Sequence, residues 1–129
     1  MLAIDDIEAS LKTAETVRRH FPKLAVYARA RNRYHAYKLI DLGANLVSRE
    51  TFLSSLDLAR QVLQGLGVSA TDASRSVAMF RKHDEALLLH QRAIYTDEAA
   101  LIQSVKQAAE ELEGLFESDS QDKRNTAAA

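Results

Sequence analysis

The residues best suited to chemistry in this chain lie together in the segment Arg29-Ala30-Arg31-Asn32-Arg33. A guanidinium group binds a carboxylate or a phosphate through paired hydrogen bonds. Asn32 can cap a following helix, and the free N–H groups of a helix start also favour an anion. We therefore expect an anion-binding site that includes Arg29, Arg31, Asn32 and His35.

The charges of the chain are unevenly distributed, and this leaves a second interpretation open. Seven basic residues and no acid lie between residues 18 and 38, whereas eight acids and one base lie between residues 97 and 122. The arginines of the first segment can pair with the acids of the second, within one chain or between chains. The net charge is only −1, which argues against a dedicated nucleic-acid binder.

Other chemistry-bearing patterns are sparse. His83 and His90 are seven residues apart and share a helical face, but solvent-exposed histidines are commoner than a metal site, and we expect no metal. The chain has no cysteine, which excludes a disulfide scaffold and a thiol nucleophile. The four glycines form no phosphate-binding fingerprint, so we expect neither an enzyme nor a nucleotide cofactor in these residues.

The elements that must position the arginines follow from the apolar spacing. Short apolar runs at residues 2–4, 24–28 and 44–47 alternate with amphipathic segments, which we expect to be helices over residues 7–21, 32–42 and 48–66. In the first helix we expect Asp5 and Glu8 to form a capping box. The pattern predicts an α/β fold with half of a doubly wound sheet, three parallel strands and their helices. Parallel sheets bind ligands beyond the carboxyl ends of their strands, and we expect the arginines there.

Long C-terminal helices are expected to follow this half sheet. A fresh helix start, or a mild interruption, falls at Thr96-Asp97-Glu98. The spacing of Leu101, Val105, Ala108, Leu112 and Leu115 predicts a seam that packs on its own domain or on another molecule. We expect three parts: an α/β part over 1–67, a helical extension for dimerisation over 68–117 and a disordered tail over 118–129. A three-stranded half sheet leaves an edge uncovered, so we expect a homodimer.

Several pieces of the sequence together resemble the cytosolic regulatory region of Kef-type, glutathione-regulated potassium/proton antiporters. The pieces are Ala28 to His35, Leu42-Gly43-Ala44, Arg49-Glu50-Thr51-Phe52, Leu2 to Asp6, and Val77 to His83. The resemblance covers roughly residues 2–95. It implies the second half of a Rossmann-like regulator-of-potassium-conductance (RCK, TrkA-N) domain.

The resemblance also implies a function. In Kef-type members, glutathione holds the transporter shut, glutathione adducts open it, and the ligand lies at a dimer interface. Arg29 and Arg31 are then implied to contact the carboxylates of the ligand. Asp84 stands where the family often has an asparagine that helps to bind the peptide, and we include it among the ligand-binding residues.

We accordingly expect a regulatory piece of a potassium efflux system, cytoplasmic and attached to a membrane antiporter domain that lies outside these residues. The family's glycine-rich turn precedes Leu2 in the alignment that the resemblance implies, so we expect the chain to be a fragment without a nucleotide cofactor. No apolar run is long enough to span a membrane, and we expect no direct insertion. The alternative is a structural dimerisation module that binds no ligand.

Overall fold

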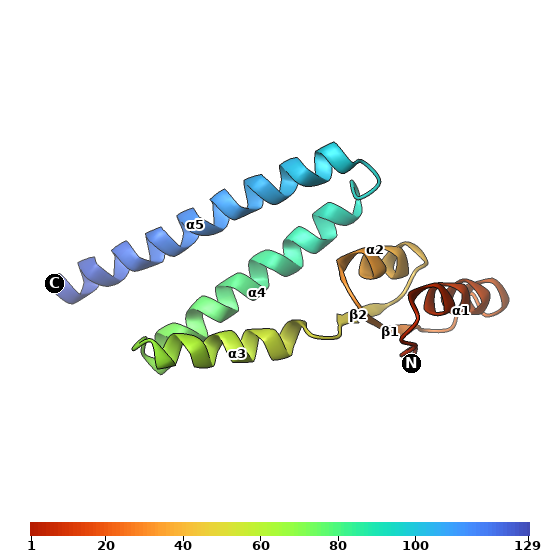
Figure 1. Cartoon of the computed structure of the whole chain (residues 1–129), viewed down its shortest axis with the longest axis horizontal. Helices are drawn as coiled ribbons and strands as arrows, with labels where there is room; N and C mark the ends of the chain where they lie inside the picture. Colours follow the sequence, from red (N-terminus) through yellow and green to blue (C-terminus); the bar gives the residue numbers. More distant parts are fainter. The chain divides into compact units, whose positions relative to one another are not determined.

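The computed structural model describes residues 1–129 and places seven helices and strands along the chain (Figure 1). They are α1 (Ile7–His20), β1 (Tyr27–Ala30), α2 (Arg33–Asp41), β2 (Leu46–Arg49), α3 (Phe52–Gly65), α4 (Ala70–Arg92) and α5 (Glu98–Ala128). The chain divides into two units, residues 1–58 and 59–129, and α3 runs across the boundary. None of the helices combines the length and the apolar character that a membrane crossing requires.

The sheet has two strands, and the prediction of three is corrected. β1 and β2 are parallel, with Tyr27 opposite Leu46. The expected strand at residues 2–4 is reduced to one bridge, in which the N–H of Leu2 donates to the carbonyl of Tyr27 at 2.8 Å and the carbonyl of Leu2 accepts from the N–H of Arg29 at 2.9 Å. The chain leaves the sheet after this bridge because α1 begins at Ile7.

Both strands begin later than the apolar runs that predicted them. The N–H of Leu24 donates to Phe21, and that of Val26 donates to the side chain of Asn45 at 2.8 Å, so loop contacts occupy this backbone. The shift places Arg29 inside β1, while Arg31 follows directly after the strand. Ser48 lies in β2, so the third helix does not begin at residue 48 as expected but at Phe52.

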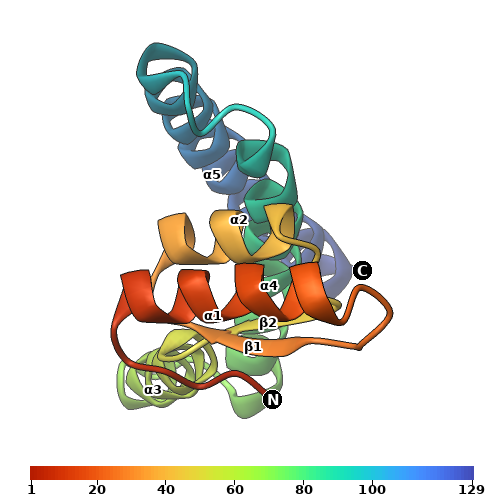
Figure 2. The same ribbon diagram turned by 90° about the vertical axis from the view of Figure 1, so that its right-hand side faces the viewer.

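The two helices that flank β1 lie side by side on the same side of the strands and begin at the same end (Figure 2). The buried residues between these elements are mostly small: Ala14, Ala28, Ala30, Ala36 and Leu39. Asp6 caps α1 by accepting from the N–H of Ala9 at 2.7 Å, so Asp5, the expected cap, is left for other contacts. Asn32 caps α2 as predicted.

Arg18 stabilises the end of the first unit at which α1 and α2 finish. Its guanidinium donates to four backbone carbonyls, those of Pro22, Leu24, Leu42 and Gly43, at 2.6–3.3 Å. Gly43 ends α2 with a φ of 84°, and a β-carbon there would lie 3.3 Å from Nε of Arg18. The positive φ favours glycine at this position, and the arginine leaves little room for a side chain.

The second unit contains a hairpin of α4 and α5, which run side by side in opposite directions (Figure 1). Ser69 caps α4 and Asp97 caps α5, so Thr96-Asp97-Glu98 is a fresh helix start. The structure continues α5 to Ala128, through the segment predicted to be disordered. Lys123 in that segment pairs with Asp119 at 2.7 Å and with Asp72 of α4 at 3.1 Å, which ties this end of α5 to α4.

A candidate anion site at the carboxyl end of the sheet

Arg29 meets two carboxylates from two different segments. Its guanidinium pairs with Asp5, which follows the bridge at Leu2, and lies 3.8 Å from Glu50, which follows β2. Its NH2 group also donates to the carbonyl of Ala3 at 3.2 Å. The side chain is one-third exposed. Its Nε is buried without a hydrogen-bond acceptor, which leaves one donor of the fork unused.

Arg31 reaches the same two carboxylates. Its Nε lies 3.0 Å from Glu50, and its NH1 lies 3.9 Å from Asp5. The Arg31 side chain is 44 % exposed and lines a cavity of about 450 Å³ together with Asp5, Asp6, Ile7, Glu8 and Asn32. Two guanidinium groups and two carboxylates therefore form one cluster beside an open cavity.

The start of each helix faces this cavity. Asp6 caps α1 and Asn32 caps α2, and both residues line it. The partial positive charge of two helix N-termini adds to that of the arginines. The amide oxygen of Asn32 accepts from the N–H of His35 at 2.8 Å, and its NH2 group is the donor that it can offer to an anion. Arg33, the third arginine of the segment, points elsewhere, with its Nε 3.3 Å from the hydroxyl of Tyr37.

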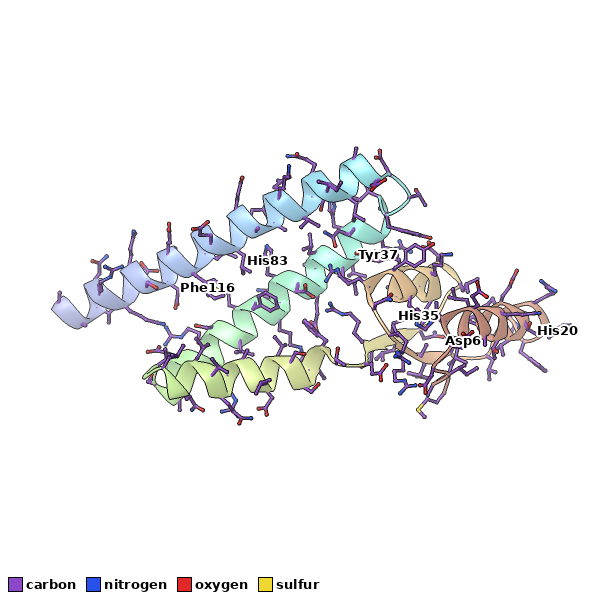
Figure 3. All side chains as sticks on the ribbon, viewed as in Figure 1. Asp6, His20, His35, Tyr37, His83 and Phe116 are labelled. Carbon is purple, nitrogen blue, oxygen red and sulfur yellow. The ribbon has the colours of Figure 1, made fainter.

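His35 lies beneath the site and does not line it, which corrects the expectation of a direct ligand contact. Its side chain is fully buried, and Figure 3 labels its place in the first unit. Nδ1 accepts a hydrogen bond from the backbone N–H of Arg31 at 3.0 Å, so the proton is on Nε2, which donates to the hydroxyl of Ser10 at 3.0 Å. Burial, and then the positive charge of Arg31, lower the pKa of His35. His35 therefore acts as a neutral positioning residue for Arg31.

The cluster is balanced in charge. The negative charges of Asp5 and Glu50 offset the positive charges of Arg29 and Arg31. The structure therefore pairs these arginines with Asp5 and Glu50 and not with the acids of the C-terminal helices. The two carboxylates differ in exposure: the Asp5 side chain is 76 % exposed and that of Glu50 is 32 % exposed. An exposed ion pair contributes at most about 1 kcal/mol, so an incoming anion can displace Asp5 at small cost.

Asp84 belongs to the second unit, where it lies half-buried on α4. Arg29 and Arg31 belong to the first unit. In the same hairpin His83 lies between α4 and α5, 3.7 Å from Glu111 (Figure 3). His90 lines the same hollow of about 310 Å³. No three acidic or histidine side chains of the chain come together as metal ligands.

Sequence reasoning missed Asp5 and Glu50 as part of the site. Asp5 was interpreted as a helix cap, and Glu50 was used only for the family resemblance. A signal for both was present, because each follows an apolar run that pairs with β1 in parallel. The carboxyl ends of parallel strands meet at one edge, which is the rule that located Arg29 and Arg31.

Comparisons with known proteins divide the chain near the same place as the structure does. Residues 1–50 match the TrkA-N domain, and residues 54–129 match the potassium efflux system KefB C-terminal domain. A solved structure, the Kef C-terminal domain of Shewanella denitrificans in its AMP-bound form, is 38 % identical and covers 70 % of this chain with a TM-score of 0.67. The chain spans 58 % of that protein's length.

Proposed function

Because this chain belongs to the Kef family of potassium efflux systems, within the C-terminal regulatory region, we propose that it senses an anionic ligand and thereby gates potassium/proton antiport. The proposed ligands are glutathione and its S-substituted adducts, bound at a homodimer interface. The module then works on the cytosolic face of the membrane, attached to the antiporter domain of its parent protein. Its role is regulatory and not catalytic.

The observation that carries this proposal is the convergence of Arg29 and Arg31 on one partly open cluster. Two forks face the same small region, a cavity adjoins Arg31, and two helix N-termini begin beside it. The Nε of Arg29 is a buried donor without an acceptor, so a ligand carboxylate would reach it only after the side chains around it move. A peptide with two carboxylates fits this arrangement, since each carboxylate can take the place of one that the arginines now hold.

Ligand binding would act on the module by replacing an internal contact. When a ligand carboxylate displaces Asp5, the segment that joins Leu2 to α1 loses its tie to β1. A ligand shifts the balance between two arrangements only by its difference in affinity for them. We propose that glutathione and its adducts favour different arrangements of this segment at the dimer interface.

We propose Asp84 as a further ligand contact. A carboxylate accepts hydrogen bonds, so Asp84 would meet an ammonium or amide N–H of the ligand and not its carboxylates. Where an asparagine can both donate and accept, an aspartate at this position restricts the orientation of the bound peptide.

AMP is a second anion to consider, since the Shewanella domain is described in an AMP-bound form. Residues 1–129 contain no glycine-rich fingerprint that would let the backbone approach a phosphate. We therefore propose no nucleotide cofactor within these residues, and AMP serves as the comparison ligand in the test.

A structural dimerisation module without a ligand is the second candidate. The observation that favours it is the pairing of both arginines with Asp5 and Glu50, which already neutralises their charge. In this account the cluster holds the segment before α1 on the sheet and does nothing else.

Calorimetric titration separates the two candidates. Glutathione, an S-substituted adduct and AMP are each titrated into the full chain and into a variant that combines Arg29→Ala with Arg31→Ala. Arg19→Ala is the control, because this exposed arginine pairs only with Glu15 in its own helix. Saturable binding of glutathione or the adduct that the double variant loses and the control keeps supports the sensing function. Absence of binding to the wild-type chain, or equal binding to the double variant, supports the structural candidate.

A further inference from the structure

Three carboxylates line the cavity beside Arg31, and two of them already have a role within the chain. Asp5 pairs with the arginines of the cluster, and Asp6 caps α1 with its carboxylate. Glu8 lies in the first turn of α1, and its side chain makes neither an ion pair nor a hydrogen bond within the chain. Glu8 therefore offers the cavity a carboxylate that a ligand can use.

The charges of this cavity do not suit a ligand that is only anionic. Its lining contains one guanidinium group, that of Arg31, against the three carboxylates. A ligand carboxylate that binds Arg31 would enter a space that Glu8 also lines, and like charges that are brought together in a binding site oppose binding. A positive group next to the ligand carboxylate would turn this repulsion into attraction. The lining therefore favours a ligand that carries both charges close together.

An α-amino acid head group carries such a pair, because its ammonium and its carboxylate are attached to one carbon atom. The carboxylate matches the guanidinium of Arg31, and the NH2 group of Asn32 can donate to the same carboxylate. The ammonium has three donors and no acceptor, so it matches the carboxylate of Glu8. The cavity volume of about 450 Å³ falls within the range of small-ligand sites.

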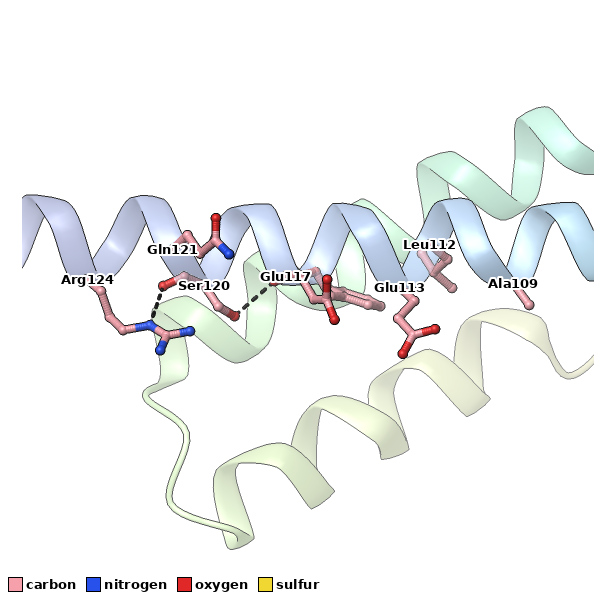
Figure 4. A pocket seen from close by; sticks show the side chains of 8 residues that line it. Ala109, Leu112, Glu113, Glu117, Ser120, Gln121 and Arg124 are labelled. Carbon is pink, nitrogen blue, oxygen red and sulfur yellow. Dashed lines mark hydrogen bonds between the residues drawn. The ribbon is translucent and has the colours of Figure 1, made fainter.

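A larger hollow, which runs along α5, does not combine its charges in this way (Figure 4). It measures about 790 Å³, and its charged lining residues are Glu113, Glu117 and Arg124. Arg124 lies seven residues beyond Glu117, or about 10 Å along the helix axis. Its Nε donates to the carbonyl of Ser120 at 3.3 Å, and Figure 4 shows its side chain well apart from both glutamates. The two charges of an amino acid head group are too close together to reach both signs here.

We propose that the cavity beside Arg31 binds the α-amino acid head group of the ligand, and that Glu8 selects for its ammonium. This inference rests on the proposed function and adds the part of the ligand that the cavity takes. In glutathione the head group is the γ-glutamyl end, which carries the free ammonium. Substitution at sulfur leaves this end unchanged, so glutathione and its adducts enter the cavity in the same way. The contact proposed for Asp84 is then with an amide N–H.

Calorimetric titration with a deaminated analogue of glutathione tests the requirement for the ammonium. In this analogue a hydrogen atom replaces the amino group, while the thiol and both carboxylates remain. The full chain should bind it about tenfold more weakly than glutathione, the loss that corresponds to one charge-assisted contact. Equal affinity for the two ligands would overturn the inference and leave the proposed sensing function intact. Failure of glutathione itself to bind would overturn the proposed function and this inference with it.

Glu8→Gln tests the assignment of the ammonium to this residue. Glu8 is exposed, and glutamine keeps its size while removing its charge. The variant should bind glutathione about tenfold more weakly and should bind the deaminated analogue as the wild-type chain does. Glu113→Gln makes the same change in the hollow along α5 and should alter neither affinity. If Glu8→Gln weakens both ligands equally, or neither, then Glu8 does not bind the ammonium and the inference is wrong.

Reversal of the charge at the same position gives a result that a loss of stability would not produce. Glu8→Lys places an ammonium of the protein where that of the ligand is proposed to lie. This variant should therefore prefer the deaminated analogue to glutathione, the opposite of the wild-type preference. Glu113→Lys is the matched control and should keep the wild-type order. A Glu8→Lys chain that still prefers glutathione would show that the ammonium is bound elsewhere and would overturn the inference.

Discussion

The backbone N–H of Arg31 donates a hydrogen bond to Nδ1 of His35, at 3.0 Å. His35 is fully buried, and its other ring nitrogen donates to Ser10 of α1. One imidazole therefore links the first helix, the second helix and the residue that carries an arginine of the site. The position of Arg31 depends on this neutral ring.

Replacements of His35 should distinguish the contribution of its hydrogen bond with Arg31 from that of its hydrogen bond with Ser10. His35→Ala leaves the N–H of Arg31 and the hydroxyl of Ser10 without a partner and should lower the free energy of unfolding by about 2–4 kcal/mol. The amide oxygen of His35→Asn can still accept from Arg31, and the longer His35→Gln can still reach Ser10. In chemical denaturation, His35→Asn and His35→Gln should each have a higher free energy of unfolding than His35→Ala. Equal losses of this free energy in all three variants would contradict a role of His35 toward both Arg31 and Ser10.

Stability should also fall in mild acid because of the same residue. The pKa of His35 lies below its ordinary value of 6.5 in the folded chain, chiefly because the ring is buried. Below pH 6.5 the unfolded chain binds a proton that the folded chain does not, so the free energy of unfolding decreases, by no more than about 1.4 kcal/mol per pH unit. Above that pH the residue has no effect. When denaturation is measured from pH 5 to 8, the free energy of unfolding of His35→Asn should decrease less toward low pH than that of the wild-type chain.

Two adjacent aspartates give a matched test of competition at the arginine cluster. Asp5 pairs with Arg29, whereas Asp6 caps α1. Asp5→Asn removes a competing carboxylate and should tighten binding of glutathione by up to about fivefold, the factor that corresponds to ~1 kcal/mol for an exposed pair. Asp6→Asn removes the same charge but keeps the cap, since asparagine is an equally good capping residue. If glutathione binding tightened by the same factor in both variants, the cause would be the change in overall charge and not the removal of a carboxylate that competes for Arg29.

The far end of α5 should loosen when its lysine is removed. The hydrogen bond from Lys123 lowers the pKa of Asp119 and of Asp72, and Asp119 raises the pKa of Lys123. In Lys123→Met, amide hydrogen exchange over residues 116–128 should become faster, with little change in α4. Lys82→Met, at an exposed position of α4 outside this cluster, is the control. Unchanged exchange in Lys123→Met would show that the ion pairs do not hold this helix end.

Much of the fold follows from the apolar spacing, and the Kef resemblance is confirmed. The helix start at Asn32 and the helix end at Gly43 depend on local chemistry, a capping side chain and a positive φ, which a sequence displays directly. The third strand was wrong for a reason that is not local. Leu2 makes only one bridge because α1 begins so soon after it, and the length of a strand depends on its neighbours.

The site was predicted in part. The arginines were located by the rule for parallel sheets, but their partners Asp5 and Glu50 were not recognised because they lie 24 and 21 residues from Arg29. His35 was predicted to line the anion site because a histidine beside arginines suggests a ligand contact. Its burial results from packing between α1 and α2, which the sequence of one helix does not reveal. The ligand roles of Arg29, Arg31, Asn32 and Asp84 remain predictions.

The most direct measurement of the central claim observes the two guanidinium groups themselves. In a nitrogen-15-labelled chain, the Nε–H resonances of Arg29 and Arg31 are assigned with the single variants Arg29→Lys and Arg31→Lys and followed during addition of glutathione. We predict saturable shifts of both resonances at the same midpoint, while that of Arg19 stays in place. Resonances of Arg29 and Arg31 that do not move, or that move no more than Arg19, would contradict an anion site at the carboxyl end of the sheet.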